Sequence, residues 1–338
     1  MDGDIVLAQE GTAHDWRAKP STCPENFTIN FRGYDQPAAE SLGANLGQVF
    51  GDLGRVIDIS NLDGVTVAYD YDQALAELDR GYETSYVLER TKDVAIGVAM
   101  TPSVLRNDKL KSHIVLLGNV ADLIAGNDGG TFGMALHTIA HECAHVETTA
   151  AWDKCFPGEL LRARFPNLFA AWRWDVMSAC WEEYAACRIA GAIGHDPVPG
   201  YEETFLKVLS EIDDKVADTV SGFEGGNADP LVASLFGAFG NLMKFACYLQ
   251  GALRGTGRGR DELGVADALS SSWFSPYFDR LDEACAKIFD EFGSWSDKSG
   301  FDVIGDIVVE LIESKVAHIW HREDGSYFIR IHHPRCRA

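Results

Sequence analysis

The spacing of apolar residues predicts mixed α and β structure in the first third of the chain. A short helix is expected over 36–50, and apolar and polar residues then alternate on both sides of Asp63-Gly64, a pair typical of hairpin turns. Two more β-rich runs follow before residue 119. The expected strands are 56–59, 65–69, 94–100 and 113–118. These runs predict a small sheet of about four strands.

After a Gly-rich segment at 126–130, the apolar residues recur with the period of an α-helix. The first long helix is expected over 132–149, with Thr131 or Gly130 as its cap. An irregular stretch over 152–165 should separate it from a second long helix that runs from Pro166 to about Ile193. Further helices are expected at 202–220, 230–253, 262–273, 278–292 and 301–317, followed by a hairpin of strands 316–320 and 327–331.

The pattern as a whole predicts an α+β fold. We expect a domain of sheet and helices over 1–195 and a mainly helical part over 196–338 that ends in the hairpin; one continuous fold is the alternative. The apolar run 231–253 is long enough to cross a membrane, but its small and polar residues favour a buried helix.

Composition narrows the range of partners and locations. The chain has 51 Asp and Glu against 29 Lys and Arg, a net charge of −22, which argues against nucleic acid as the main partner. The first residues lack the basic and long apolar stretches of a signal peptide, and the eight cysteines form no CxxC pair. A reduced, cytoplasmic location is therefore expected. No feature of the sequence specifies an oligomeric state.

The strongest chemical signal is His141-Glu142-Cys143-Ala144-His145, an HExxH motif within the first long helix. Residues four apart lie about 40° from each other around a helix axis, so both imidazoles can reach one Zn²⁺. Glu142 would lie beside the metal, where it can take a proton from a zinc-activated water and act as general base. Chance would produce roughly 0.02 such motifs in a chain of this composition.

A catalytic zinc needs a third protein ligand, and two adjacent glutamates in the second long helix are the candidates. Glu183 lies in a stripe of small and apolar residues, where a carboxylate is costly unless it is paired or bound to a metal. Glu182 shares its stripe with Asp175 and Ser178, which is typical of a solvated face. We therefore expect Glu183 to be the ligand, with Glu182 as the alternative.

His141-Glu142-x-x-His145 followed by Glu183-x-x-Ala186-x-x-x-Ala190 resembles the gluzincins, in particular the small ImmA/IrrE-like metallopeptidases. The resemblance spans 141–190. It implies a zinc-dependent endopeptidase with a minimal zincin fold, in which His141, His145 and Glu183 bind zinc and Glu142 is the catalytic base. The interval between His145 and Glu183 is longer than is usual in that family, and no helix-turn-helix segment stands out.

Three residues near the motif each have two interpretations. His137, one turn before His141, is expected to be a hydrogen-bonded neighbour; the alternative is a role at the cleft in support of the metal ligands. Tyr184 and Arg188 flank the expected ligand and could stabilise an oxyanion. Because both share a helix face with large apolar residues, packing and an ion pair are favoured for them.

The remaining cysteines and histidines carry weaker signals. Cys180 and Cys187 share a helix face two turns apart and should pack as small hydrophobic residues, as should Cys143. The C-terminal hairpin could hold a second metal, or could border the cleft as a strand with which a peptide pairs. The side chains concerned are His318, His321, His332, His333 and Cys336.

The sequence therefore predicts a cytoplasmic zinc metallopeptidase that acts on a protein or peptide and has neither nucleic acid nor a membrane as its partner. One alternative is a binding or regulatory protein of zincin fold with a structural zinc; another is a zinc hydrolase of a non-peptide amide. Glu142 argues against the structural role, because a structural site has no use for a general base. Acidic residues at the cleft would favour basic substrate segments.

Overall fold

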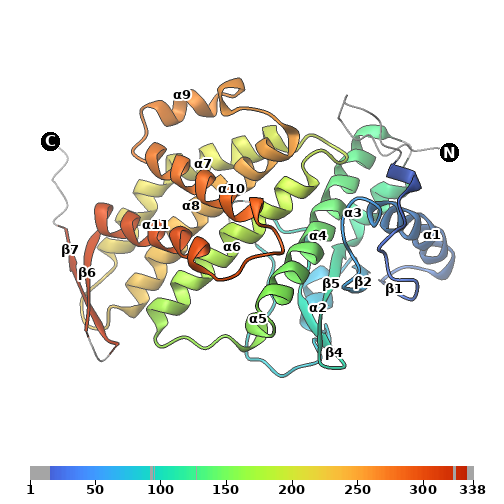
Figure 1. Cartoon of the computed structure of the whole chain (residues 1–338), viewed down its shortest axis with the longest axis horizontal. Coiled ribbons are helices and arrows are strands. Elements are labelled where there is room, and N and C mark those ends of the chain that lie inside the picture. The colour runs from blue at the N-terminus through green and yellow to red at the C-terminus, as the bar shows by residue number, and fades with distance from the viewer. Residues whose placement is uncertain (1–15, 92–93, 95, 127, 323–324, 333–338) are drawn as a thin grey trace. The chain divides into compact units, whose positions relative to one another are not determined.

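A computed structural model describes residues 16–91, 94, 96–126, 128–322 and 325–332. Its fold is α+β, with one five-stranded sheet, a two-stranded hairpin and a majority of helical residues (Figure 1). The described residues form two compact units. The first comprises residues up to Leu160 with Ala185–Pro199 and Gly251–Arg258, and the second comprises Leu161–Tyr184, Gly200–Gln250 and the residues from Gly259 onward. The expected domain boundary at 195/196 stays a prediction.

The sheet of the first unit is mixed. Its strands are β1 (Thr28–Arg32), β2 (Leu62–Ala68), β3 (Ala99–Met100), β4 (Ser103–Arg106) and β5 (Lys109–Leu117). The order is β1-β2-β5-β3, and β4 also pairs with β5. β1, β2 and β5 run parallel, whereas β3 and β4 run antiparallel to β5. The helix α1 (Gln36–Leu53) connects β1 to β2, as a parallel pair requires.

The hairpin expected around Asp63-Gly64 is wrong, because both residues lie within β2, where the pairing with β5 shifts register between Leu62 and Gly64, and 56–59 is not a strand. Both residues make close contacts with neighbouring strands of the sheet. A side chain on Gly64 would place its Cβ 3.0 Å from the carbonyl oxygen of Thr28 on β1. The carboxylate of Asp63 accepts a hydrogen bond from Arg106 Nε at 3.1 Å. The Asp-Gly pair thus reflects close strand packing and an ion pair, which local sequence does not distinguish from a turn.

The turn that the sheet does contain lies at Asn107-Asp108, between β4 and β5. Both residues have positive φ, 50° and 60°, as a two-residue turn of type I′ needs. The expected strand 94–100 shrinks to Ala99–Met100, and part of that range lies outside the described residues. β1 was not expected at all. Its residues Thr28–Arg32 do alternate between polar and apolar, but the run is only five residues long and none of its side chains is buried, so the signal for a strand is short.

The helices of the first unit pack against the sheet. Besides α1 they are α2 (Tyr71–Ala76), α3 (Gly118–Asp122) and α4 (Gly129–Cys155), with the short turns η1 (Trp16–Ala18) and η2 (Leu123–Ala125). One hydrophobic core joins Phe50 of α1, Val65 of β2, Ile114 of β5 and Ile139 of α4.

The first long helix, α4, exceeds its expected bounds at both ends. Its cap is Asp128, whose carboxylate accepts a hydrogen bond from the backbone N–H of Thr131, so the expectation of Thr131 or Gly130 as cap is wrong. The helix continues to Cys155, and the stretch expected to be irregular also contains α5 (Glu159–Arg162). An Asp cap outside the apolar run explains the early start.

The second unit is built from helices and ends in the expected hairpin. Its elements are α6 (Leu168–Ala190), α7 (Val198–Ser221), α8 (Asp229–Thr256), η3 (Arg260–Glu262), α9 (Val265–Ser270), α10 (Ser275–Asp290), α11 (Ser299–Lys315), β6 (Ala317–His321) and β7 (Tyr327–Ile331). The single helix expected over 262–273 is wrong, since η3 and α9 divide it. α6 and α8 also contribute residues to the first unit. Trp181 of α6 is fully buried in an aromatic cluster with Trp295 and Phe301.

Within the described part of the chain, α8 is the helix whose length and composition would suit a membrane span. However, 67% of its most apolar window is buried inside the protein, and core helices of globular proteins pass the same test. Leu235, Leu242 and Leu249 on this helix are fully buried, as expected from the sequence.

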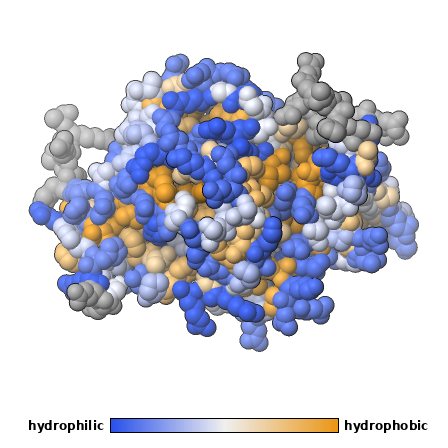
Figure 2. Space-filling view, in the orientation of Figure 1, coloured by the Kyte–Doolittle hydropathy of each residue, from blue (hydrophilic) through white to orange (hydrophobic). Residues whose placement is uncertain are grey.

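On the face shown in Figure 2, hydrophilic residues predominate along the margins, with hydrophobic residues between them.

A network of hydrogen-bonded polar side chains links β2 and β5. His113 Nε2 lies 2.9 Å from the hydroxyl of Thr66, and His113 Nδ1 lies 3.1 Å from the carboxylate of Asp63. Both Thr66 and His113 are buried. Burial lowers the pKa of His113 below its ordinary value of 6.5, against the opposing effect of the Asp63 carboxylate.

We expect the buried His113 of this hydrogen-bond network to make the free energy of unfolding depend on pH. Because the pKa of His113 is lower in the folded state, the unfolded protein binds more protons as the pH falls through 6.5, so the free energy of unfolding decreases on the acid side. Urea unfolding of the wild type and of His113→Asn from pH 7.5 to 5.0 measures this. The wild type should lose stability more steeply than the variant, and parallel curves would contradict the expectation.

Candidate metal centre

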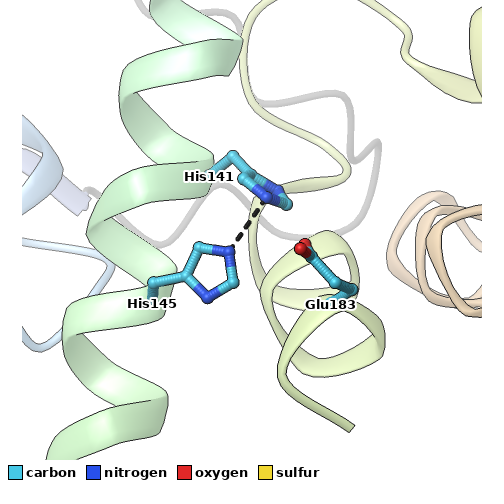
Figure 3. A group of neighbouring side chains, drawn as sticks. All are labelled: His141, His145 and Glu183. Atoms are coloured by element: carbon cyan, nitrogen blue, oxygen red, sulfur yellow. Dashed lines mark hydrogen bonds between the residues drawn. The ribbon is translucent and has the colours of Figure 1, made fainter. Parts of the chain in front are cut away.

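The residues expected to bind a metal lie on two helices. His141 and His145 project from successive turns of α4, and Glu183 projects from α6 (Figure 3). One ligand atom from each residue lies within 4.8 Å of the other two. His141 is buried, and the other two side chains are half-buried. In the described part of the chain, this is the one group of three or more His, Cys, Asp or Glu side chains that could hold a metal ion.

The arrangement of these three side chains is compatible with a bound metal ion. The dashed line in Figure 3 joins Nε2 of His141 to Nε2 of His145, which are 3.1 Å apart. Two nitrogen ligands about 2.0–2.1 Å from a tetrahedral ion would be roughly 3.3 Å apart. The carboxylate of Glu183 points toward the two rings, and its Oε2 atom is shielded from solvent. Two imidazoles and one carboxylate are a donor set that zinc hydrolases use.

Both helices carry small residues near the candidate ligands. Ala140 and Ala144 of α4 and Ala186 and Ala190 of α6 are all fully buried in the core cluster of the first unit. Side chains of one carbon let two helix backbones approach closely, so that ligands from both helices can meet.

The segment after α6 is tied to the beginning of α4. The backbone N–H of His195 donates to the carbonyl oxygen of Gly133 at 3.0 Å. Gly194 has a φ of +78°, and a side chain there would place its Cβ 2.5 Å from the same carbonyl oxygen. Glycine at this position permits the close approach, because it has no side chain and adopts a positive φ without strain.

Glu142 is held by a residue from the sheet. Its side chain is 6% exposed, and the hydroxyl of Thr101 donates a hydrogen bond to its Oε2 at 2.6 Å. The same hydroxyl lies 3.2 Å from the carbonyl oxygen of Glu142. Thr101 sits between β3 and β4, so the pairing of both strands with β5 sets its position. The sequence contained no signal for Thr101, because this contact joins residues 41 positions apart.

Tyr71, at the start of α2, is a second residue near Glu142 that the sequence did not indicate. It is fully buried, and its hydroxyl makes no hydrogen bond within the described structure. Burial and the negative charge of Glu142 raise the pKa of Tyr71. The hydroxyl therefore stays protonated at neutral pH and keeps its proton available for a hydrogen bond.

Cys187 contacts one of the candidate ligands directly. Its Sγ lies 3.8 Å from Nδ1 of His141, and both side chains are buried. The expected packing role is thus incomplete: Cys187 is fully buried, but part of what it packs against is an imidazole of the candidate metal centre. Its position one turn after Glu183 on α6 is a signal that could have indicated this. Cys143, by contrast, is buried in the core, as expected.

His137 lies outside the group of three. Its Nδ1 is 3.2 Å from the carbonyl oxygen of Ile193, and its ring centre is 6.5 Å from that of His141. Burial, with a smaller contribution from His141, lowers the pKa of His137 to about 4, so the ring is neutral at neutral pH. His137 therefore ties the end of α6 to α4, in keeping with the expected hydrogen-bonded neighbour.

The neighbours of Glu183 are also separate from the group. Glu182 accepts a hydrogen bond from the hydroxyl of Ser178 at 3.1 Å. Tyr184 is fully buried, with its ring stacked 6.4 Å from that of Trp181, and Arg188 is half-buried on the last turn of α6. The aromatic contacts of Tyr184 favour packing over an oxyanion role.

The histidines of the C-terminal hairpin make contacts of other kinds. His332 Nε2 lies 2.7 Å from the carbonyl oxygen of Glu313, and the ring of His321 packs edge-on against Phe169. The ring centres of His318 and His332 are 6.5 Å apart. His333 and Cys336 lie outside the described residues.

No family model, no curated protein and no solved structure matches this chain. The functional assignment therefore rests on the residues and geometry of the candidate metal centre.

Proposed function

We propose that this protein is a zinc-dependent peptidase. The observation that carries the proposal is the convergence of His141, His145 and Glu183, with the carboxylate of Glu142 on the same helix. Structural zinc sites use four protein ligands, frequently thiolates, whereas catalytic sites use three and leave one position for water or substrate. Three ligands of this type next to a buried carboxylate favour a catalytic site.

The residues of the candidate metal centre would have different roles in the proposed hydrolysis. His141, His145 and Glu183 would hold Zn²⁺, which when bound supplies Lewis acidity toward a carbonyl oxygen and toward water. Glu142 accepts a proton from the attacking water and passes it to the leaving amine. Thr101 restricts the rotation of Glu142 by its hydrogen bond to Oε2, so the carboxylate is already oriented before substrate arrives.

The buried position of Glu142 also argues against a purely structural zinc. A carboxylate that is 6% exposed loses much of its hydration, and a protein that needed only a structural metal would gain nothing from that cost. Hydrolysis of a non-peptide amide would use the same residues, so the substrate class must be tested directly.

Metal content and cleavage together test the proposal. We expect the protein, purified at neutral pH without chelators, to contain about one zinc per chain, as three converging ligands imply. Incubation with a peptide library and with simple amides, read by mass spectrometry of new termini, should show peptide cleavage that a chelator stops. Protein without zinc would refute the proposal, and zinc with cleavage of neither substrate type would favour the binding role.

A further inference from the structure

We propose that Cys187 is a positioning residue for His141, which it orients through the ring nitrogen that faces away from the other candidate ligands. This inference rests on the proposed function and extends it by assigning a thiol to the support of a zinc ligand. The sequence suggested only a packing role for Cys187.

The two nitrogens of the His141 ring have different surroundings. Nε2 faces Nε2 of His145 at 3.1 Å, on the side where Glu183 converges (Figure 3). Nδ1 faces Sγ of Cys187 at 3.8 Å, a distance within the range of hydrogen bonds to sulfur. The ring is thus oriented by contacts on both of its nitrogen atoms.

Zinc binding would determine which nitrogen carries the proton. A nitrogen that binds a metal uses its lone pair, so when Nε2 is the ligand the proton resides on Nδ1. That N–H then donates to Sγ of Cys187, since a thiol sulfur is a weak acceptor. Because both side chains are buried, bulk water cannot readily replace this interaction.

The helix α6 couples this support to the ligand set. Cys187 lies four residues after Glu183, and residues four apart share one face of a helix. One face of α6 would therefore supply both a ligand and the group that orients a second ligand on α4. Partners of this kind fix the tautomer and the angle of a ligating imidazole, and their loss typically costs about 10–100-fold in metal affinity.

The experiment compares two buried cysteines of the first unit in the full-length protein. Cys187→Ala removes the acceptor, and Cys143→Ala is the matched control, because Cys143 is equally buried but packs in the hydrophobic core. The Zn²⁺ dissociation constant is measured by competition with a chromophoric chelator. We expect Cys187→Ala to weaken zinc binding by about 10–100-fold and Cys143→Ala to stay near the wild-type value.

Three further measurements separate positioning from packing. The visible absorption bands of the Co²⁺-substituted protein should shift in Cys187→Ala and not in Cys143→Ala. Zinc should raise the melting temperature less in Cys187→Ala than in the wild type, whereas a packing defect alone would leave that increment unchanged. Cys187→Ser, which keeps an acceptor, should restore much of the affinity.

The possible results distinguish a failure of the positioning role of Cys187 from a failure of the proposed function. Equal zinc affinities and equal Co²⁺ spectra for Cys187→Ala and Cys143→Ala would overturn the positioning role while leaving the proposed function intact. A wild-type protein that binds no zinc would instead overturn the proposed function. If Cys187→Ala fails to fold, Cys187→Val fills the space without an acceptor, and wild-type zinc affinity in that variant would likewise refute the inference.

Discussion

Replacing Glu142 by glutamine is expected to lower kcat/KM for peptide hydrolysis by about 10²–10⁴-fold, the contribution of a general base, while the zinc content stays at the wild-type level. Glutamine has nearly the shape of glutamate and can still accept the hydrogen bond from Thr101. It cannot take a proton from water. The loss should therefore appear in kcat, and zinc bound per chain should be unchanged by elemental analysis.

Glu147→Gln is a suitable control for this prediction. Glu147 lies on the same helix, and its carboxylate accepts a hydrogen bond from the backbone N–H of Asp58 at 3.1 Å, away from the candidate metal centre. This variant should keep its activity. Hydrolysis by Glu142→Gln at the wild-type rate would remove Glu142 from the mechanism, and loss of zinc in that variant would assign it to the ligand set instead.

Replacing Glu183 by glutamine is expected to weaken zinc binding by more than about 100-fold, because a direct ligand contributes more than the outer partners whose loss costs 10–100-fold. The amide oxygen that remains is neutral and is a poorer ligand than a carboxylate. Chelator competition on the full-length protein measures the change, and hydrolysis should fall in parallel because fewer molecules carry zinc.

The neighbouring residue provides the matched control. Glu182→Gln removes the same charge from the same helix turn, but Glu182 accepts a hydrogen bond from Ser178 and lies outside the group of three. We expect its zinc affinity to remain near that of the wild type. The reverse result, with zinc lost in Glu182→Gln and kept in Glu183→Gln, would assign the ligand role to Glu182.

The fold was predictable where the apolar pattern is long and regular. Most helices beyond residue 129 and the terminal hairpin were expected within a few residues of their observed bounds, because periodicity repeated over many residues outweighs single exceptions. The sheet was predicted less well. Asp63-Gly64 has the composition of a turn, yet it lies within a parallel strand, where Gly64 pairs with Thr28 of β1 and leaves little room for a side chain.

For the candidate site too, features that depend on local sequence were predictable. The residues of the proposed chemistry could be inferred without the structure, since the spacing of His141, Glu142 and His145 acts through the geometry of a single helix. The sequence also favoured Glu183, whose charge interrupts an apolar stripe. These inferences needed only local periodicity and the cost of burying a carboxylate.

The surroundings of those residues depend on long-range contacts. The Thr101 hydroxyl reaches Glu142 across 41 positions, and the Cys187 sulfur reaches His141 across 46 positions. Such contacts depend on how strands pair and how closely two helices pack, and no periodicity of the chain encodes them. The type of each group was therefore readable from the sequence, whereas its orientation and its hydrogen-bond partners were set by long-range packing.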